Sequence, residues 1–395
     1  MARARAAASA PYGVADLLAA KEMVVVCGSG GTGKTTVAAA LGAQAAQATG
    51  GRVLVLTVDP ARRLAVALGL GHLGVGNTPV RVPAEAFHDA GAECRGELWV
   101  AMLDTKAGWD DLIRRQAPSP ALRDRVLANP LYLNITGRFV NSHDYIAMEQ
   151  LHDMHASGRW DLVVIDTPPS RNALDLLDAP GRMREFFGSR LLKWLTVPYR
   201  SRLFTSASKP FYQVADRVLG SRFLQDIAEF FVLFQSMEDG FVRRATQVER
   251  LLHDDRTTFV VVSTLEPAPA REARFLADEL RRRGMPLGAM VLNRTLPPTV
   301  RQPAAAKAAK ALRGVDAASL DAVSQMVGSP ADSVERVLGT VAECFGDLAV
   351  AAGREAERRS ELETVSPLTA VVPTLPADVH DLAALLAIGR HLVEG

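Results

Sequence analysis

The chain has 395 residues, of which 48% are apolar, and its formal net charge is +1. That apolar fraction is ample for a substantial core, and the balanced charge argues against a strongly basic nucleic-acid-binding protein. The three cysteines are far apart and form no CxxC pair, so neither a disulfide framework nor a thiolate zinc site is expected. No apolar run is long enough to span a bilayer, and the N-terminus lacks the apolar core of a signal peptide. We therefore expect a cytoplasmic protein with no nucleic-acid partner and no stable membrane insertion.

A glycine-rich loop follows the first predicted strand, at 23–27, and precedes an alanine-rich helical stretch at 37–46. Residues 28–36 read GSGGTGKTT, the pattern of a phosphate-binding loop in its usual strand, loop and helix context. The glycines let backbone N–H groups close around phosphate oxygens at the N-terminus of the helix. The residues that we expect to bind nucleotide here are Gly28, Gly30, Gly31, Thr32, Gly33, Lys34, Thr35 and Thr36.

Three side chains of this loop have expected roles. Lys34 reaches the β and γ phosphates, Thr35 offers its hydroxyl to Mg²⁺, and Thr36 contacts the α phosphate. We therefore predict that the chain binds ATP and Mg²⁺.

Further short apolar runs alternate with helical patterns along the chain. This alternation is typical of an α/β protein whose mostly parallel sheet is covered by helices on both faces. The predicted strands lie at 23–27, 53–58, 98–103, 162–165, 258–262, 289–292 and 369–372. We expect residues 1–395 to form a single P-loop ATPase domain.

Long helical stretches interrupt the alternation. We expect helical insertions at 105–150 and 181–254, and a helical segment at 317–364 before the last strand. Aromatic residues gather in the second insertion. They form either an apolar groove for a partner or client protein or, as their helical spacing favours, the core of a helical subdomain. These residues are Trp194, Tyr199, Phe204, Phe211, Tyr212, Phe223, Phe230, Phe231 and Phe234.

Two aspartates stand at the carboxyl ends of predicted strands, where ligands of parallel sheets gather. Asp59 follows the strand at 53–58 and is placed to orient and deprotonate the attacking water. Asp166 follows the strand at 162–165 in the position of a Walker B acid, where a carboxylate holds Mg²⁺ directly or through water. Aspartate is also a common turn residue at the end of a strand. The assignment of these two acids therefore depends on both lying beside the glycine loop.

Two residues late in the chain are candidates for contact with the base. Asn293 closes the strand at 289–292, and its amide can hydrogen-bond a purine, although a turn explains an asparagine there equally well. Pro373 opens the sequence PTLP, which is expected to form a rigid loop over the base.

The segments GSGGTGKTT, TVDPARRL, VVIDTPPSRNALDLLDAP, VLNR and VVPTLP resemble, in this order, those of the arsenical-pump ATPase (ArsA) family of deviant P-loop ATPases. That family includes the targeting factor for tail-anchored membrane proteins, and the resemblance covers residues 23–375. It implies that Asp59 positions water in switch I, that 166–170 form switch II and that Asn293 binds adenine. It also implies dimers whose ATP sites lie near the interface and open and close with the nucleotide.

One loop position departs from the family pattern. Family members carry a signature lysine at the second position, which reaches the partner's ATP, whereas this chain has Ser29 there. A cation supplied in trans to a transferring phosphoryl group is worth roughly 10³ to 10⁵ in rate. A homodimer is therefore expected to hydrolyse ATP slowly. We favour a heterodimer, as in bacterial paired-subunit members, in which a related ATPase subunit retains the lysine and completes the site.

The missing positive charge can also come from within the chain. Arg62, Arg63 or Arg171, in or beside the switch motifs, can replace it locally. The chain is alternatively a nucleotide-binding regulatory subunit with little hydrolysis of its own, or a membrane- or chromosome-positioning ATPase. The sequence favours an Mg²⁺-dependent ATPase that couples its nucleotide state to the helical insertion, where it holds a hydrophobic client or a partner.

Overall fold

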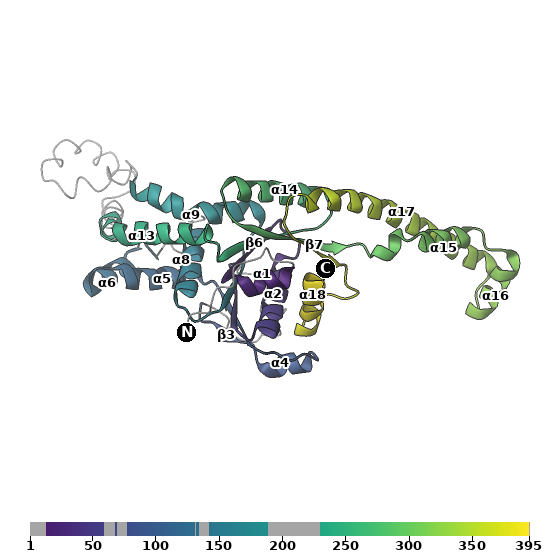
Figure 1. The fold of residues 1–395 in the computed structure, drawn as a ribbon, viewed down its shortest axis with the longest axis horizontal. Helices are drawn as coiled ribbons and strands as arrows, with labels where there is room; N and C mark the ends of the chain where they lie inside the picture. The colour runs from purple at the N-terminus through teal and green to yellow at the C-terminus, as the bar shows by residue number, and fades with distance from the viewer. Residues whose placement is uncertain are drawn as a thin grey trace.

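The computed structural model of the chain describes residues 13–58, 68, 77–130, 132–133, 142–188 and 230–394. At its centre is an eight-stranded sheet with the order β3-β4-β2-β5-β1-β6-β7-β8 (Figure 1). The strands are β1 (Met23–Gly28), β2 (Arg52–Thr57), β3 (Val80–Arg81), β4 (Glu97–Met102), β5 (Leu162–Asp166), β6 (Thr257–Ser263), β7 (Leu287–Thr295) and β8 (Thr369–Pro373). All neighbouring strands are parallel except the β3–β4 pair at one edge. The predicted α/β class, a P-loop fold with a mostly parallel sheet, is confirmed.

All seven predicted strands are present, and their bounds agree within one or two residues at most ends. The main difference is β7, which extends beyond the predicted run to Thr295. The additional strand, β3, has only two residues and pairs antiparallel with β4 at Val100 and Trp99. So short a segment carries no alternating pattern by which it could be recognised in the sequence.

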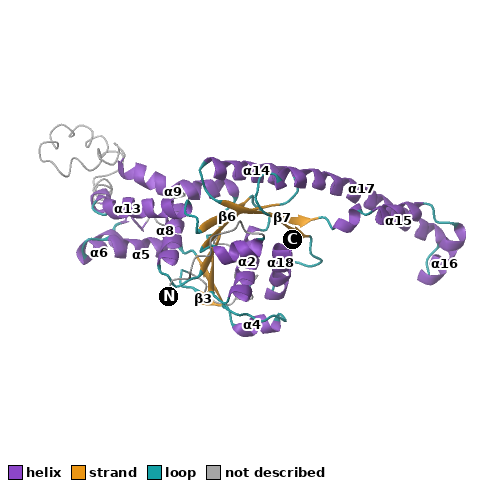
Figure 2. Cartoon of the chain, in the orientation of Figure 1, coloured by secondary structure: helices purple, strands orange, loops and turns teal. Residues whose placement is uncertain are grey.

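Helices cover both faces of the sheet (Figure 2). Before β6 the helices are α1 (Val14–Ala20), α2 (Lys34–Thr49), α4 (Ala84–Asp89), α5 (Thr105–Gln116), α6 (Pro120–Ala128), α8 (Ser142–Ala156), α9 (Ser170–Gly188) and α13 (Glu238–Leu252). After β6 they are α14 (Pro267–Arg282), the 3₁₀ turn η1 (Pro298–Arg301), α15 (Pro303–Arg313), α16 (Ala317–Val327), α17 (Ala331–Glu363) and α18 (Leu382–Glu394).

The alternation of side chains along β1 shows why the sheet needs both layers. Met23 and Val25 belong to one buried cluster, which includes apolar residues of α5, α8, α13 and α14. Val24 and Val26 belong to a second cluster, formed with residues of α1, α2 and α18. Since successive side chains of a strand point to opposite faces, an uninterrupted apolar strand must be covered on both sides.

The described parts of the two predicted insertions are helical. Phe234, from the predicted aromatic cluster, is buried with Trp109 and Phe241 at ring-centroid distances of 6.3 and 4.8 Å. Phe230 stacks on Phe234, so these two aromatic residues form part of the core. The cluster members at 194–223 lie outside the described residues. The division into one domain with insertions stays a prediction.

Helices α15, α16 and α17 form an arm that leaves the sheet between β7 and β8 (Figure 1). Large apolar side chains are exposed along it, including Met326, Val337 and Val341. None of the helices within the described ranges is both long enough and apolar enough to cross a bilayer.

Candidate functional site

The glycine loop joins the end of β1 to the start of α2, as the sequence predicts. Gly28 has φ 151°, and a Cβ there would lie 2.0 Å from the carbonyl oxygen of Val262 in β6. Gly33 is the N-cap of α2 with φ 89°, and its Cβ would lie 2.3 Å from Nδ2 of Asn293. At both positions the backbone conformation favours glycine, and neighbouring atoms leave no room for a Cβ. The loop can therefore close tightly over the N-terminus of α2, where backbone N–H groups and the helix dipole favour an anion.

Two side chains hold the loop from within. The hydroxyl of Thr32 donates to the carbonyl oxygen of Ser29 at 2.9 Å, and Nζ of Lys34 donates to the same oxygen at 2.8 Å. Lys34 is only 8% exposed. Its ammonium group therefore lies against the loop backbone, where a phosphate bound by the loop would meet a positive charge.

A buried carboxylate lies beneath the loop. Oδ2 of Asp166, at the end of β5, accepts hydrogen bonds from the hydroxyls of Thr35 at 2.7 Å and Thr57 at 2.9 Å. Asp166 is fully buried, and its three-residue cluster comes from α2, β2 and β5. Hydroxyl and carboxylate oxygens are the donors that Mg²⁺ prefers, so Thr35 and Asp166 fit the predicted metal site.

Thr57 is a site residue that the sequence pattern does not predict. It is paired with Asp166 in the parallel β2–β5 ladder, which places both residues at the same edge of the sheet. A threonine at the end of a buried strand is common, and only the strand order shows that this one faces Asp166.

The loop also contacts residues at the carboxyl ends of β5 and β7. The Cβ position of Gly30 is 3.8 Å from the Pro169 side chain, just after β5. Nδ2 of Asn293 donates to the carbonyl oxygen of Thr32 at 2.8 Å, and Asn293 is buried. This amide therefore supports the loop, while its contact with adenine stays a prediction. Pro373 ends β8 and is paired with Thr295 of β7, so it lies at the same strand edge.

A second residue that the sequence pattern does not predict follows Asn293 and contacts the loop. Nη1 of Arg294 donates to the carbonyl oxygen of Gly31 at 3.3 Å. Arg294 is exposed and has φ 55°. Nothing in the sequence VLNR distinguishes this arginine from a surface residue.

Some predicted residues cannot be placed. Asp59, Arg62 and Arg63 lie outside the described residues. Arg171 lies in the first turn of α9, but its side chain is not described. Thr36 is partly buried in the first turn of α2.

The thiol nearest the loop, Cys27, is not poised to react. Burial raises its pKa to about 12, against a smaller lowering by the charge of Lys34. Since the thiolate is the reactive form, Cys27 acts as a neutral core side chain in β1.

Comparisons with known proteins agree with this geometry. The family model of the anion-transporting ATPases, ArsA_ATPase, matches residues 21–329, a range that includes the glycine loop, Asp166 and Asn293. An uncharacterised protein of Streptomyces coelicolor is 29% identical over 274 residues, which is 69% of this chain and 62% of that protein. The match thus spans less than two thirds of that relative's length. Because the family model covers most of the chain, and because the glycine loop, its helix and the Asp166 cluster are in place, the chain belongs to the ArsA family of anion-transporting ATPases.

Proposed function

We propose that the chain is an Mg²⁺-dependent ATPase that acts as a nucleotide-gated switch. Family membership indicates nucleotide binding and ATP hydrolysis. The observation that carries the proposal is the convergence of Thr35 and Thr57 on Asp166, because that carboxylate ends β5 only four residues before α9 begins. Hydrolysis or release of the phosphate would therefore alter contacts only four residues from the start of α9.

The loop residues have separate tasks in this proposal. Loop amides and Lys34 bind the phosphates, and Thr35 and Asp166 hold the metal ion. Bound Mg²⁺ neutralises charge on the phosphate oxygens. Thr57 holds the Asp166 carboxylate in place from β2. Asp59 remains our proposed residue for positioning the attacking water.

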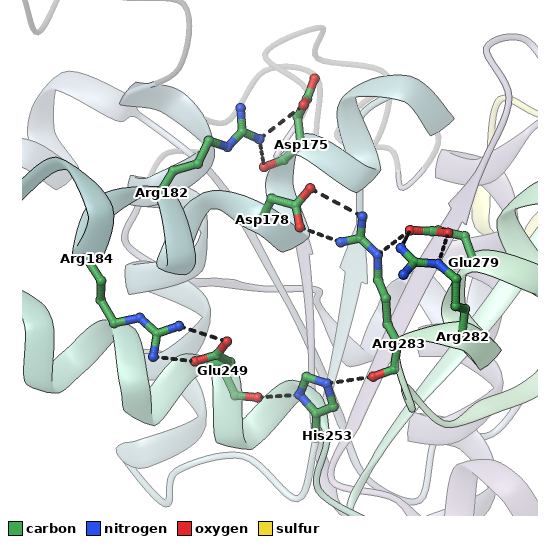
Figure 3. Close-up of polar contacts among 9 residues, drawn as sticks. All are labelled: Asp175, Asp178, Arg182, Arg184, Glu249, His253, Glu279, Arg282 and Arg283. Atoms are coloured by element: carbon green, nitrogen blue, oxygen red, sulfur yellow. Dashed lines mark hydrogen bonds and ion pairs between the residues drawn. The ribbon is translucent and has the colours of Figure 1, made fainter. Parts of the chain in front are cut away.

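Ion pairs join α9 to its neighbouring helices (Figure 3). Arg184 of α9 contacts Glu249 of α13, with Nη1 2.8 Å from Oε2. Asp178 of α9 accepts from Arg283, at the end of α14, and Arg283 also contacts Glu279 with Nε 2.7 Å from Oε1. A displacement of α9 would therefore shift or break its ion pairs with α13 and with the end of α14.

A histidine side chain also ties the same helices together. The imidazole of His253 lies between the carbonyl oxygens of Glu249, at 2.8 Å, and Arg283, at 3.0 Å. It thus links the end of α13 to the end of α14, close to the two ion pairs (Figure 3). We propose that these contacts make the helices on this face respond to the nucleotide as one unit and present a binding surface for a hydrophobic client or a partner.

The residue type at position 29 motivates the proposal of a paired assembly. Ser29 is 6% exposed, and its carbonyl oxygen accepts bonds from Thr32 and Lys34 within the loop. Because serine carries no charge, position 29 offers none to a neighbouring site. We propose that this chain forms a heterodimer with a related subunit that retains the signature lysine, and that its hydrolysis alone is slow.

Single-turnover hydrolysis tests the paired assembly. The wild-type chain and the Ser29→Lys variant are measured with and without a copurified partner. Acceleration by the partner, or by the lysine in a homodimer, supports the proposal. Nucleotide binding with no hydrolysis in any combination would identify the chain as a regulatory subunit instead.

Hydrogen exchange tests the switch. We expect amides of α9 and α13 to exchange at different rates with a non-hydrolysable ATP analogue and with ADP, each in the presence of Mg²⁺. The arm helix α16, which packs on α17, is the internal control. Equal exchange in α9 and α13 in both nucleotide states would refute the switch.

A further inference from the structure

The arm carries most of the large apolar side chains that are exposed to solvent (Figure 1). Among the described residues eight such side chains are exposed, and six of them lie on α16 and α17. These six are Met326, Val327, Val337, Val341, Leu348 and Val350. Single apolar residues scattered over a surface are ordinary, but their concentration on one projecting element is typical of an interaction surface.

Three of these residues form a stripe along α17 together with an exposed cysteine. Val337, Val341, Cys344 and Leu348 follow one another at intervals of four, three and four residues, and we call them the α17 stripe. Val337, Val341 and Leu348 are 59%, 49% and 42% exposed, and Cys344 is exposed as well. This spacing keeps the four side chains on one side of the helix, and it is the spacing of the seam by which one helix packs on another.

Other residues of α17 make its contacts within the chain. The helix packs on α15 and α16, and Val334 and Ala342 are its buried residues along this part of the arm. At 100° per residue, the face that these two mark is centred about 100° around the helix from the stripe. Nearer the sheet, Glu355 accepts a hydrogen bond from the backbone N–H of Leu296 at 2.9 Å. The arm is thus attached to the rest of the chain, while the stripe faces solvent.

Two opposite charges flank the stripe on one side. Arg336 directly precedes Val337, and Asp347 directly precedes Leu348, so the two charged residues are eleven positions apart and share a flank of the helix. Within the described part of the chain Arg336 donates to the hydroxyl of Ser333 at 3.3 Å, and neither Arg336 nor Asp347 forms an ion pair. Both charges are therefore available to a molecule that covers the stripe.

A second copy of α17 in antiparallel orientation fits the stripe. Val337 of one copy then lies opposite Leu348 of the other, and Val341 lies opposite Cys344, so the four positions pair among themselves. This alignment has a two-fold axis midway along the stripe, the symmetry of most dimers of identical chains.

The same axis pairs the charges. Two antiparallel helices related by a two-fold axis place the same flank side by side, so Arg336 meets Asp347 of the second copy at an offset of roughly two residues, or 3 Å along the helix. The reciprocal pair forms at the other end. Glu343, between the two, lies farther around the helix from the stripe. A parallel pair would separate these flanks and form neither ion pair.

We propose that the α17 stripe is a self-association surface, at which the arms of two copies of this chain pack antiparallel. The occupant is a second copy because the apolar residues and the charges of the stripe complement themselves under a two-fold axis. This inference goes beyond the proposed function, since pairing through the arm needs no nucleotide. It is compatible with a related subunit at the nucleotide site. The stripe is roughly 16 Å long, so the contact is small, and we expect a dissociation constant of about 10⁻⁵ M.

Sedimentation velocity of the full chain without nucleotide, from about 1 to 100 µM, measures this association. We expect a monomer at the low end and a dimer at the high end. Val341→Glu places a charge inside the stripe and should raise the dissociation constant at least about tenfold. Val350→Glu is the matched control, because Val350 is 57% exposed on the same helix but about 140° from the stripe. It should dimerise like the wild type.

A charge exchange tests the antiparallel arrangement. Arg336→Asp alone, or Asp347→Arg alone, sets like charges against each other at both ends of the stripe and should weaken the dimer about tenfold at low salt. The double variant with both substitutions forms both pairs again with reversed sign and should regain the wild-type dissociation constant.

Cys344 supplies a distance test that needs no substitution. The Cα atoms of the two Cys344 residues should lie about 10 Å apart in the proposed pair, so a short bismaleimide should join two copies. Cys27 is buried and Cys94 is partly buried, and the Cys344→Ser variant, which should give no joined product, controls for both.

Three results would overturn the inference. They are a chain that stays monomeric up to about 100 µM, a dimer that Val341→Glu weakens no more than Val350→Glu does, and a double charge variant that associates no better than the single variants. The first would leave the stripe to a different protein, and the second would place the dimer contact elsewhere. Since none of these measurements involves ATP, their failure would leave the proposed ATPase function standing.

Discussion

The hydroxyl of Thr35 donates to the carboxylate of Asp166 at 2.7 Å, which connects the first turn of α2 to the end of β5. The glycine loop and the switch-like segment after β5 therefore share one polar contact. Since Asp166 also accepts from Thr57, three elements meet at a single carboxylate oxygen.

Thr57→Val should raise the Mg²⁺ concentration needed for half-maximal ATP hydrolysis by about tenfold, because a buried carboxylate loses a hydrogen bond that orients it toward the metal. Thr57→Ser keeps the hydroxyl and serves as the control. Magnesium titrations of steady-state hydrolysis give the comparison. The same Mg²⁺ requirement in wild type and Thr57→Val would show that Thr57 plays no part in the site.

Gly33→Ala should lower the free energy of unfolding by about 2 kcal/mol, because alanine is strained at positive φ and its Cβ would meet the Asn293 amide. Repeating the substitution in an Asn293→Ala background removes the loss of stability caused by the steric clash and leaves the loss caused by backbone strain. Urea unfolding of the four proteins measures the coupling. Strictly additive losses would mean that the close approach of Asn293 to Gly33 does not exist in solution.

The sequence predicts the fold and the loop well because both depend on local patterns. Seven of the strands are apolar runs bounded by turn residues, and the loop GSGGTGKTT is contiguous. Asp166 could be predicted because it directly follows a strand, and parallel strands end at a common edge.

Contacts between distant segments could not be predicted. Thr57 meets Asp166 only because β2 and β5 are neighbours in the sheet, and Arg294 reaches Gly31 only because a bulge redirects it. The Asp178–Arg283 pair joins residues 105 positions apart, and arginines and aspartates are frequent on exposed helix faces throughout this chain. Residue type and spacing carry no information on such pairs.

Asp178→Asn should reduce the nucleotide-dependent difference in hydrogen exchange in α14, because it removes the ion pair from α9 to Arg283. Stability should fall by less than about 1 kcal/mol, since Asp178 is half exposed. Asp278→Asn is the matched control, because Asp278 pairs with Arg281 inside α14 and bridges no helices. If both variants keep the full nucleotide-dependent difference in hydrogen exchange in α14, the Asp178–Arg283 ion pair does not couple α14 to the nucleotide.

Asp153→Asn should destabilise the protein by about 2 kcal/mol at neutral pH, because charged hydrogen bonds to α5 and α13 are lost. Burial alone would raise the pKa of Asp153, but the neighbouring His152 and the charges and hydrogen bonds of Arg115 and Arg244 together lower it to about 2.

The sign of the pH dependence follows from that lowered pKa. The folded pKa of Asp153 lies below the unfolded value of about 4, so its contribution is complete above pH 4 and is lost as the pH falls toward 2. The stability difference between wild type and Asp153→Asn, from urea unfolding, should therefore narrow over this range. A difference that stays constant down to pH 2.5 would contradict the assignment.

Calorimetric titration of the folded chain with ATP and Mg²⁺ tests the central claim, that the loop at 28–36 and Asp166 form a nucleotide site. We predict saturable binding of one ATP per chain, weakened about tenfold to a hundredfold by Lys34→Ala, which removes a charge-assisted contact with phosphate. No ATP uptake by the folded wild-type chain, or equal affinity in the Lys34→Ala variant, would contradict the account.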